Sequence, residues 1–240
     1  MPIRLRSHTT AAELARVTMS AIVLTVLTLV PFAGSVSASK DDGAFGWKVL
    51  SFPGVEPTRF MIGQDRQIEV IANRSSAVLY RPLAADEAAL RFLSWRWRVE
   101  MADMTADLSR KGKDDRPLAI HLLFPPTRGD GGEREATGKP DIPELLAEGF
   151  VLTYVWGGAQ GQGARVPNPY FDGRGWQIIL RDAGADTRRW FEEKVNFDHD
   201  FEKAFGFAPP IPGFIAISGD SDDSRSQSIG KIADMTFTDE

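Results

Sequence analysis

Cysteine is absent from this 240-residue chain and histidine occurs only three times, and these two shortages exclude several kinds of chemistry. Without cysteine there is no disulfide, no thiol nucleophile and no lipid attached through sulfur. After the N-terminal leader only His121 and His199 remain, so a three-histidine zinc site cannot be built there, and no H-E-x-x-H occurs. The G-x-S-x-G and P-loop motifs are also missing. Of the familiar catalytic sets, a pair of carboxylates remains available.

The chain also lacks a long membrane-spanning run near its start, where the sequence has the character of a signal peptide. Residues 21–30 are apolar and uncharged, which is short for a membrane span of about 20 residues. Three arginines precede this run, and Val36-Ser37-Ala38 fits the small-residue rule for cleavage. We therefore expect residues 1–38 to be removed as a signal peptide and the mature protein to be periplasmic or secreted. An N-terminal anchor that stays uncleaved is the alternative.

Positive charge is in short supply in the remaining residues 39–240. They contain 25 basic and 32 acidic residues, which gives a net charge of −7. This acidity disfavours nucleic acid and anionic membrane surfaces as partners, and no stable membrane insertion is expected after cleavage. About 200 residues are enough for one domain with a packed core, which must supply the stability that disulfides cannot.

Short alternating or β-branched runs separated by turn residues fill most of the chain and predict an all-β antiparallel sandwich. Helices that alternate regularly with strands, as in a parallel α/β sheet, are not predicted. The predicted strands are 46–52, 58–62, 67–72, 77–82, 90–100, 118–124, 150–156, 176–181, 214–218 and 229–237.

Two segments interrupt this pattern and predict one or two short helices. Residues 125–149 form a long polar insertion with one helical turn at 143–147. Farther along, Phe197, Phe201 and Phe205 recur at four-residue spacing, which is typical of one face of a helix. Asn196 or Asp198 is suited to cap the start of this helix, and Gly206 its end.

The stretch L-S-W-R-W-R-V-E at residues 93–100 alternates indoles with guanidinium groups. Since successive side chains of a strand point to opposite faces, Trp95 and Trp97 share one face while Arg96 and Arg98 share the other. Burying each indole stabilises the fold by about 5 kcal/mol, whereas burying an unpaired guanidinium costs at least several kcal/mol, so the tryptophans face the core. The arginines then either form local ion pairs at the surface, for example with Glu100, or hold a carboxylate or sugar hydroxyls of a ligand.

Two acidic groups flank predicted strands. Asp114 and Asp115 come just before strand 118–124, and Asp220 and Asp222 follow strand 214–218. The second group offers oxygen ligands for Ca²⁺ but does not fit an EF-hand, and turn hydrogen bonds to the backbone are the simpler interpretation. The first group is interpreted as a turn, a loop ion pair or part of a ligand site.

Tyr154 and Trp156 share one face of a predicted strand that runs into a glycine-rich loop at 157–163. An aromatic ring at such a strand end can stack on a sugar. It can equally be the rim of the core.

Several motifs, in a fixed order, carry a family resemblance: W-R-W-R-V at 95–99, Asp114-Asp115, Y-V-W-G at 154–157, Trp190, E-x-x-N at 193–196, D-F-x-x-x-F-G at 200–206 and I-A-I-S-G-D-S-D-D at 215–223. Together they resemble an exported bacterial family known as domain of unknown function 3047. The resemblance implies a galactose-binding-like jelly-roll sandwich. It implies no reaction and no catalytic residues, because the family has none assigned.

These observations favour an exported binding module for a carbohydrate or another polar cell-envelope ligand, without catalysis and without a cofactor other than, at most, Ca²⁺. The alternatives are a carbohydrate-active hydrolase or lyase that uses a carboxylate pair, and a purely structural envelope protein. The candidate ligand-binding residues are Arg96, Arg98, Asp114, Asp115, Tyr154 and Trp156, and the candidate metal ligands are Asp220 and Asp222.

Overall fold

A computed structural model describes residues 44–102, 106–126 and 142–240 of the chain. All of them belong to one compact unit that spans Ser35–Glu240. The predicted signal peptide, 1–38, and most of the predicted insertion lie outside the described residues. Within the described part, no helix combines the length and the apolar character that a membrane crossing requires.

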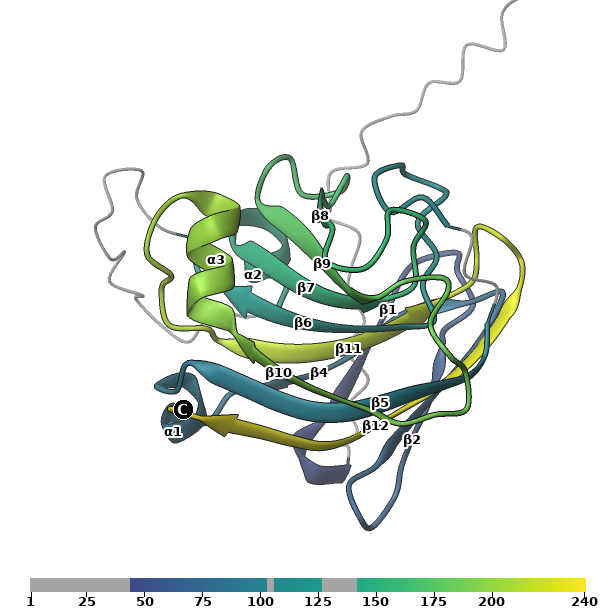
Figure 1. Cartoon of the computed structure of the whole chain (residues 1–240), viewed down its shortest axis with the longest axis horizontal. Coiled ribbons are helices and arrows are strands. Elements are labelled where there is room, and N and C mark those ends of the chain that lie inside the picture. The colour runs from purple at the N-terminus through teal and green to yellow at the C-terminus, as the bar shows by residue number, and fades with distance from the viewer. Residues whose placement is uncertain (1–43, 103–105, 127–141) are drawn as a thin grey trace, which may run out of the picture. The chain divides into compact units, whose positions relative to one another are not determined.

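The described residues form two β-sheets that pack face to face, which confirms the predicted all-β sandwich (Figure 1). The seven-stranded sheet has the order β1 (Lys48–Ser51), β4 (Ser76–Pro82), β11 (Phe214–Asp220), β6 (Leu118–Phe124), β7 (Phe150–Trp156), β9 (Gly175–Arg181) and β8 (Arg165–Pro167). The five-stranded sheet has the order β10 (Phe191–Asn196), β5 (Phe92–Met101), β12 (Gln227–Thr238), β3 (Ile68–Asn73) and β2 (Arg59–Ile62).

Each of the ten predicted strands has a counterpart in the structure, and three details differ from expectation. β8 and β10 were not predicted. The pairing of β7 with β9 is parallel, whereas the other pairings between the described strands are antiparallel. The helices number three rather than one or two in the described residues: α1 (Ala85–Ala88), α2 (Ile142–Glu148) and α3 (Phe197–Phe205), beside a 3₁₀ turn at Ala44–Gly46.

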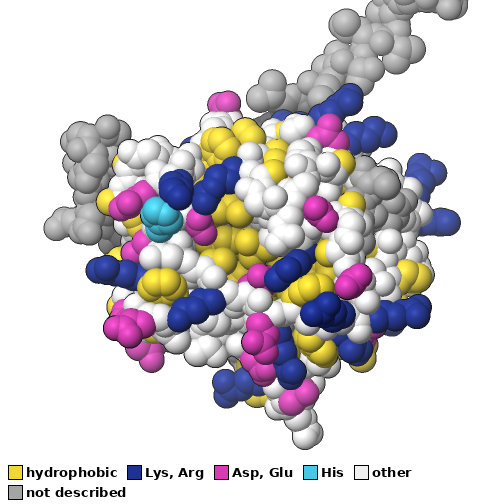
Figure 2. Space-filling model, in the orientation of Figure 1, with side chains coloured by type: hydrophobic (Ala, Val, Ile, Leu, Met, Phe, Trp, Pro, Cys, Tyr) yellow, Lys and Arg dark blue, Asp and Glu magenta, His cyan; other side chains and the backbone are white. Residues whose placement is uncertain are grey.

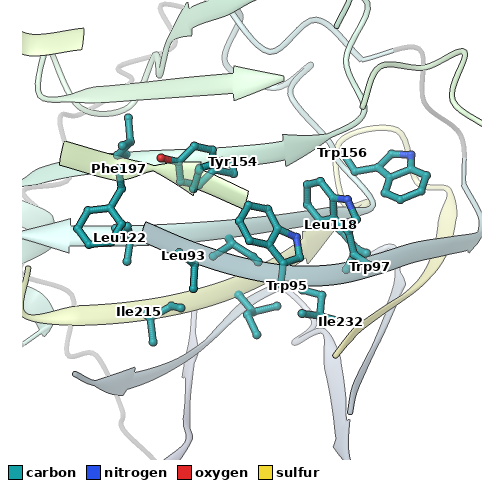
Figure 3. Close-up of a cluster of buried hydrophobic side chains, with 14 of the residues drawn as sticks. Leu93, Trp95, Trp97, Leu118, Leu122, Tyr154, Trp156, Phe197, Ile215 and Ile232 are labelled. Carbon is teal, nitrogen blue, oxygen red and sulfur yellow. The ribbon is translucent and has the colours of Figure 1, made fainter. Parts of the chain in front are cut away.

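Aromatic rings fill the centre of the core between the sheets. Trp95 and Trp97 point inward from β5 with 2% and 0% of their surface exposed, as their alternation with arginine predicts. Their rings meet edge to face at a centroid distance of 5.3 Å, and Trp97 meets Trp156 of β7 at 5.5 Å. Tyr154, also on β7, lies 5.7 Å from Trp95 (Figure 3). Such contacts contribute about 0.5–1.5 kcal/mol each beyond the buried area.

The seven-stranded sheet is covered on its outer face as well. Every residue of β6 and six of the seven residues of β7 are buried, which explains their nearly continuous apolar sequences. α2 covers part of this face with Ile142 and Leu145, and the loop that carries Leu108 covers another part. Polar side chains on this outer face are therefore enclosed by loops rather than open to solvent.

The segment at 187–210 combines a strand and a helix. α3 begins after Asn196, whose side chain accepts the backbone N–H of His199 at 3.0 Å, and it ends at Gly206 with φ of 82°. Phe197 and Phe201 are buried, so the phenylalanine spacing marks the helix face as predicted.

Candidate functional site

Arg96 and Arg98 lie on the outer face of β5, and partners from the protein occupy both. The Nε of Arg96 lies 2.6 Å from Asp234 Oδ2 without being aligned for a hydrogen bond, and Arg98 pairs with Glu100 as the sequence suggested. The indole of Trp190 lies over both guanidinium groups, with its centroid 4.8 Å and 5.2 Å from their central carbons. This arrangement matches a surface stabilised by local ion pairs and stacking.

Tyr154 and Trp156 do not form a stacking platform. Both side chains are fully buried, because the strand face that they share is the core face of β7. The hydroxyl of Tyr154 donates to Asp200 Oδ2 at 3.0 Å, and burial raises the pKa of this tyrosine well above 10. The expectation that these two rings contact a sugar is therefore wrong, and the interpretation as part of the core is the one that fits.

The edge between the two sheets, where β8 and β9 face β10 and α3, is joined by two carboxylates. Asp200 accepts from Arg165 Nη2 at 2.6 Å in addition to Tyr154. Glu193 accepts from Trp97 Nε1 at 2.9 Å and from Arg181 Nε at 2.6 Å. Hydrophobic side chains interspersed with basic and acidic ones are visible between the sheets on this side (Figure 2). The polar ends of two core aromatics thus find partners at the edge of the sandwich.

The two acidic groups from the sequence meet around one buried arginine. The backbone N–H of Arg116 donates to Asp220 Oδ1 at 2.7 Å, and its Nη2 lies 3.4 Å from Asp220 Oδ2. Its Nη1 donates to the carbonyl of Asp114 at 3.0 Å and lies 3.4 Å from Asp114 Oδ2. The pairing of β6 with β11 causes this meeting, because it places Ala119 opposite Ser218 and so aligns the segments beside them.

Asp115 connects this cluster to the loop after β11. Its carboxylate accepts the backbone N–H groups of Asp223 at 3.3 Å and Ser224 at 2.7 Å. These hydrogen bonds join segments that are 108 and 109 positions apart, so they are not the local turn hydrogen bonds that the sequence suggested for the acidic residues.

Tyr170 covers the cluster from a third loop and is 53% exposed. Its hydroxyl donates to Asp114 Oδ1 at 3.1 Å and accepts the backbone N–H of Gly112 at 3.2 Å. The ammonium group of Lys111 lies 5.3 Å from the ring centroid. Because both sides of the hydroxyl are bonded, the ring is held in one orientation at the surface.

A buried row of polar side chains crosses the seven-stranded sheet beside the cluster. The two ring nitrogens of His121 lie 3.0 Å from Thr153 Oγ1 and 2.9 Å from Ser218 Oγ. Gln177 lies opposite Thr153 and donates to the carbonyl of Leu108 at 2.9 Å, while its Oε1 is buried without a hydrogen-bond partner. Arg116 Nε is likewise buried without a hydrogen-bond partner.

The charges in the cluster shift the protonation of its members. Burial raises the pKa of Asp220 to about 7, and the neighbouring Asp115 and Asp114 add to the increase while Arg116 opposes it. The shift has this direction because three carboxylates share one cation. Burial, with Arg116 as the second cause, lowers the pKa of His121 to about 3.

The pKa values of the outer members of the cluster are raised, as is that of Asp220. Burial raises the pKa of Tyr170 to about 12, with Asp114 contributing to the increase. The pKa values of Asp222 and Asp223 are also raised, first by burial and then by the neighbouring aspartates. Burial is thus the main cause of each of these shifts, and neighbouring aspartates add to it.

A model of the family "Protein of unknown function (DUF3047)" matches residues 45–236. The chain belongs to this family. A search of curated proteins finds no match.

Two solved structures are similar to this DUF3047 domain. The xyloglucanase domain of NopAA, a type three effector from Sinorhizobium fredii, solved with cellobiose, aligns with a TM-score of 0.42 and 9% identity over 85% of this chain and 97% of the other. The family 11 carbohydrate-binding module from Clostridium thermocellum, solved with a β-1,3-1,4-mixed-linked tetrasaccharide, aligns with a TM-score of 0.36 and 9% identity over 82% and 92%. Likenesses at this level say nothing about what the DUF3047 domain binds.

The geometry limits the chemistry of the DUF3047 cluster. Ser218 and His121 have the contact of a nucleophile and its base, but Thr153 replaces the carboxylate that would stabilise an imidazolium, and the pKa of His121 is far too low for a base. In the described residues no group of three or more His, Asp or Glu side chains is placed to hold a metal ion. Asp220 faces Arg116, so the arrangement does not support the calcium site that the sequence suggested at Asp220 and Asp222.

Sequence reasoning missed the residues that make this cluster coherent, Arg116 and Tyr170. Arg116 directly follows the Asp114-Asp115 pair, and an arginine next to paired aspartates is a signal that could have been used. Tyr170 lies in a turn between β8 and β9, where no periodicity marks it.

Proposed function

We propose that this domain is an exported binding module that holds a carbohydrate or another polar cell-envelope ligand, without catalysis, at the surface around Tyr170. The single observation that carries the proposal is a tyrosine ring that is 53% exposed and yet fixed at its hydroxyl by Asp114 and Gly112. A ring held in place before binding loses little conformational entropy when a ligand stacks on it.

The surroundings of Tyr170 suit a polar ligand with an apolar face. The ring offers flat apolar surface, and carboxylates beside it are acceptors for hydroxyl groups. Asp223 Oδ1 lies 3.8 Å from the position that a Cβ on Gly112 would occupy, which places this acceptor close to the Gly112 N–H that holds Tyr170. Arg116 and Asp115 cross-link the segment before β6 to the end of β11 and the loop after it, and Tyr170 of a third loop is bonded to the first of these segments.

The occupied carboxylates argue against catalysis. Both oxygens of Asp220 and of Asp115 already contact the protein, and Asp114 is engaged by Arg116 and Tyr170. A catalytic carboxylate needs an oxygen within reach of the substrate. The side chain of Arg116, which neutralises the cluster, is only 10% exposed.

The proposal is tested by titrating the purified protein with ligands found on a glycan array, with isothermal titration calorimetry as the readout. Tyr170→Ala removes the ring, and we expect affinity to fall about tenfold, since stacking of this kind contributes on the order of 1 kcal/mol or more. Phe45→Ala is the matched control, because Phe45 is another aromatic that is 52% exposed and lies elsewhere in the chain. Equal affinities for the Tyr170→Ala variant and the wild type would remove Tyr170 from the site.

A hydrolase or lyase is the second candidate, and one observation favours it. Asp220, with a pKa of about 7, carries a proton over much of the neutral range and lies across Arg116 from Asp114, as in a pair of acids with different roles. Release of reducing ends from a panel of polysaccharides, lost in both Asp220→Asn and Asp114→Asn, would establish this activity. Turnover that persists in both variants would exclude this carboxylate pair.

A further inference from the structure

We infer that the Tyr170 surface prefers saccharides that carry an anionic group, either a carboxylate as in uronic acids or a phosphate, over neutral saccharides. This inference rests on the proposed function, because it concerns the same surface. Two features carry it: acidic and basic side chains lie at different depths in the loops around Tyr170, and the exposed basic ones have no ion-pair partner among the described residues.

Acidic and basic residues are nearly equal in number in segments 107–116 and 220–225, but the acidic ones lie deeper. Asp114 and Asp115 are only 6% and 5% exposed, and Asp220 has 13% of its side chain exposed. Their charge is offset from within, by the buried arginine of the cluster and by backbone N–H groups. A ligand at the surface therefore does not contact these three carboxylates.

The cations of the same segments lie at the surface. Arg110, Lys111, Lys113 and Arg225 are all exposed. In the part of the chain that the structure describes, no carboxylate lies within 4.0 Å of the charged nitrogens of these four residues. Figure 2 shows Lys and Arg side chains gathered at the upper right, the side on which Figure 1 draws the turn between β11 and β12. An anionic group of a ligand would meet opposite charge there.

One tight turn brings three of these cations together beside the ring. The backbone N–H of Lys113 donates to the carbonyl of Arg110 at 3.1 Å and closes the turn. Gly112 lies inside it with φ of 72°, a conformation that glycine adopts without strain. The Gly112 N–H donates to the Tyr170 hydroxyl, and Lys111 Nζ lies 5.3 Å from the ring centroid. The turn and its cations are therefore fixed next to the exposed ring.

The loop after β11 adds the fourth cation and lies against this turn. Asp223 Oδ1 is 3.8 Å from the position that a Cβ on Gly112 would occupy. The N–H of Ser224, held by a carboxylate of the cluster at 2.7 Å, fixes the backbone just before Arg225. Of the acidic residues in the three loops, Asp172 and Asp223 are exposed, and the others are half-buried or buried. The exposed cations thus outnumber the exposed acids.

A saccharide with an anionic substituent fits both the ring and the cations. Its apolar face stacks on Tyr170 while its carboxylate or phosphate accepts from Lys111 or a neighbouring cation, and Asp223 remains an acceptor for its hydroxyls. The flexible stem of Lys111 lets the ammonium group turn from the ring to the anion without a change in the backbone. A neutral saccharide has the stacking and the hydroxyls but not the ion pairs.

The experiment measures the affinity of the purified protein for three probes of equal length by calorimetry at low ionic strength. The probes are a galacturonate oligomer, the same oligomer with every carboxylate methyl-esterified, and a galactose oligomer that carries one terminal phosphate. We expect at least one anionic probe to bind about tenfold more tightly than the ester, since several exposed ion pairs act together. Added salt should narrow this difference. The two anionic probes distinguish carboxylate from phosphate as the preferred group.

Variants that remove charge test the cause of the preference. Lys111→Gln combined with Lys113→Gln should lower the ratio of the better anionic affinity to the ester affinity about threefold. Lys48→Gln combined with Lys203→Gln is the matched control, because these exposed lysines belong to β1 and α3 and their loss changes the net charge equally. We expect the control to leave the ratio unchanged. Tyr170→Ala should weaken the binding of anionic probe and ester alike.

The outcomes separate this inference from the proposed function. An ester that binds as tightly as both anionic probes would overturn the preference and leave the binding function in place. An equal fall of the ratio in the two double variants would overturn it as well, because the net charge alone would then explain the preference. Absence of binding by all three probes overturns the inference, and the glycan array then decides whether the binding function fails too.

Arg225→Gln repeats the test on the second loop and should also lower the ratio. A ratio that neither this variant nor the Lys111 and Lys113 double variant changes would overturn the inference. Circular dichroism melts of each variant confirm that it is folded.

Discussion

Arg116 holds Asp220 through both its backbone and its side chain: the N–H donates to Oδ1 at 2.7 Å and Nη2 lies 3.4 Å from Oδ2. The two residues are 104 positions apart in the sequence, and their pairing joins the segment before β6 to the last residue of β11. A buried pair of this kind does not guarantee stability, but removal of one partner leaves an uncompensated charge behind.

Replacement of Arg116 by methionine tests how much the cluster depends on this cation. We expect the free energy of unfolding to fall by about 3–5 kcal/mol, because Asp114 and Asp220 would lose their shared partner in a buried setting. Urea unfolding followed by tryptophan fluorescence measures the change. Arg189→Met is the control, since the pair of Arg189 with Asp186 is largely exposed and such pairs contribute less than about 1 kcal/mol. Equal losses in the two variants would contradict the central role of Arg116.

The raised pKa of Asp220 predicts that the free energy of unfolding falls as the pH rises. Its pKa is about 7 in the folded state against an ordinary 3.8, so the folded state prefers the protonated acid. Asp220 therefore contributes fully to the free energy of unfolding at a pH below its ordinary pKa. This contribution, which is at most about 4 kcal/mol, is lost as the pH rises through 7. Asp220→Asn resembles the protonated form and lacks this dependence. The stability of the wild type minus that of the variant should therefore decrease between pH 4 and pH 8, and a constant difference would contradict the raised pKa.

The lowered pKa of His121 predicts the opposite dependence: the free energy of unfolding falls as the pH falls, over a pH range that overlaps that of Asp220. Burial and Arg116 lower its pKa to about 3, whereas the unfolded chain has an ordinary value of 6.5. His121 therefore contributes fully to the free energy of unfolding above pH 6.5. This contribution, which is at most about 5 kcal/mol, is lost as the pH falls towards 3. His121→Gln removes it, so the stability of the wild type minus that of the variant should decrease as the pH falls. The substitution also changes the packing, which shifts the stability difference by the same amount at every pH. The dependence of this difference on pH is therefore the quantity to compare.

The elements that sequence alone predicts well are those with an uninterrupted pattern. β6 and β7 match the predicted ranges because turn residues bound their apolar runs. The alternation of indole and guanidinium groups in β5 predicts the orientation of that strand equally well. Burial of an unpaired arginine would cost free energy, whereas burial of a tryptophan stabilises the fold, so the indoles face the core.

The cluster is different, because its existence depends on pairing between distant strands. The sequence drew attention to Asp114, Asp115 and Asp220, but their meeting around Arg116 requires β6 to lie next to β11 in one register. Nothing local specifies that register. Tyr154 and Trp156 were misassigned for a related reason: only the three-dimensional packing shows that a strand leading into a glycine-rich loop turns these rings to the core.

β10 was missed because one of its inward positions carries a charge. Phe191, Glu193 and Val195 alternate towards the interior, and a glutamate among them hides the pattern of a strand. Glu193 is tolerated there, with 11% of its side chain exposed, because Trp97 Nε1 and Arg181 Nε both donate to it.

Glu193→Gln should therefore destabilise the fold, while Glu192→Gln should not. Glutamine keeps an acceptor for Trp97 but removes the negative charge that Arg181 requires, so we expect a loss of about 1–3 kcal/mol in the free energy of unfolding. Glu192 is the matched control, since it precedes Glu193 directly and points to the exposed face of β10. Denaturant melts give the stabilities. A change of the same size in both variants would mean that the hydrogen bonds of Glu193 contribute nothing beyond a surface charge.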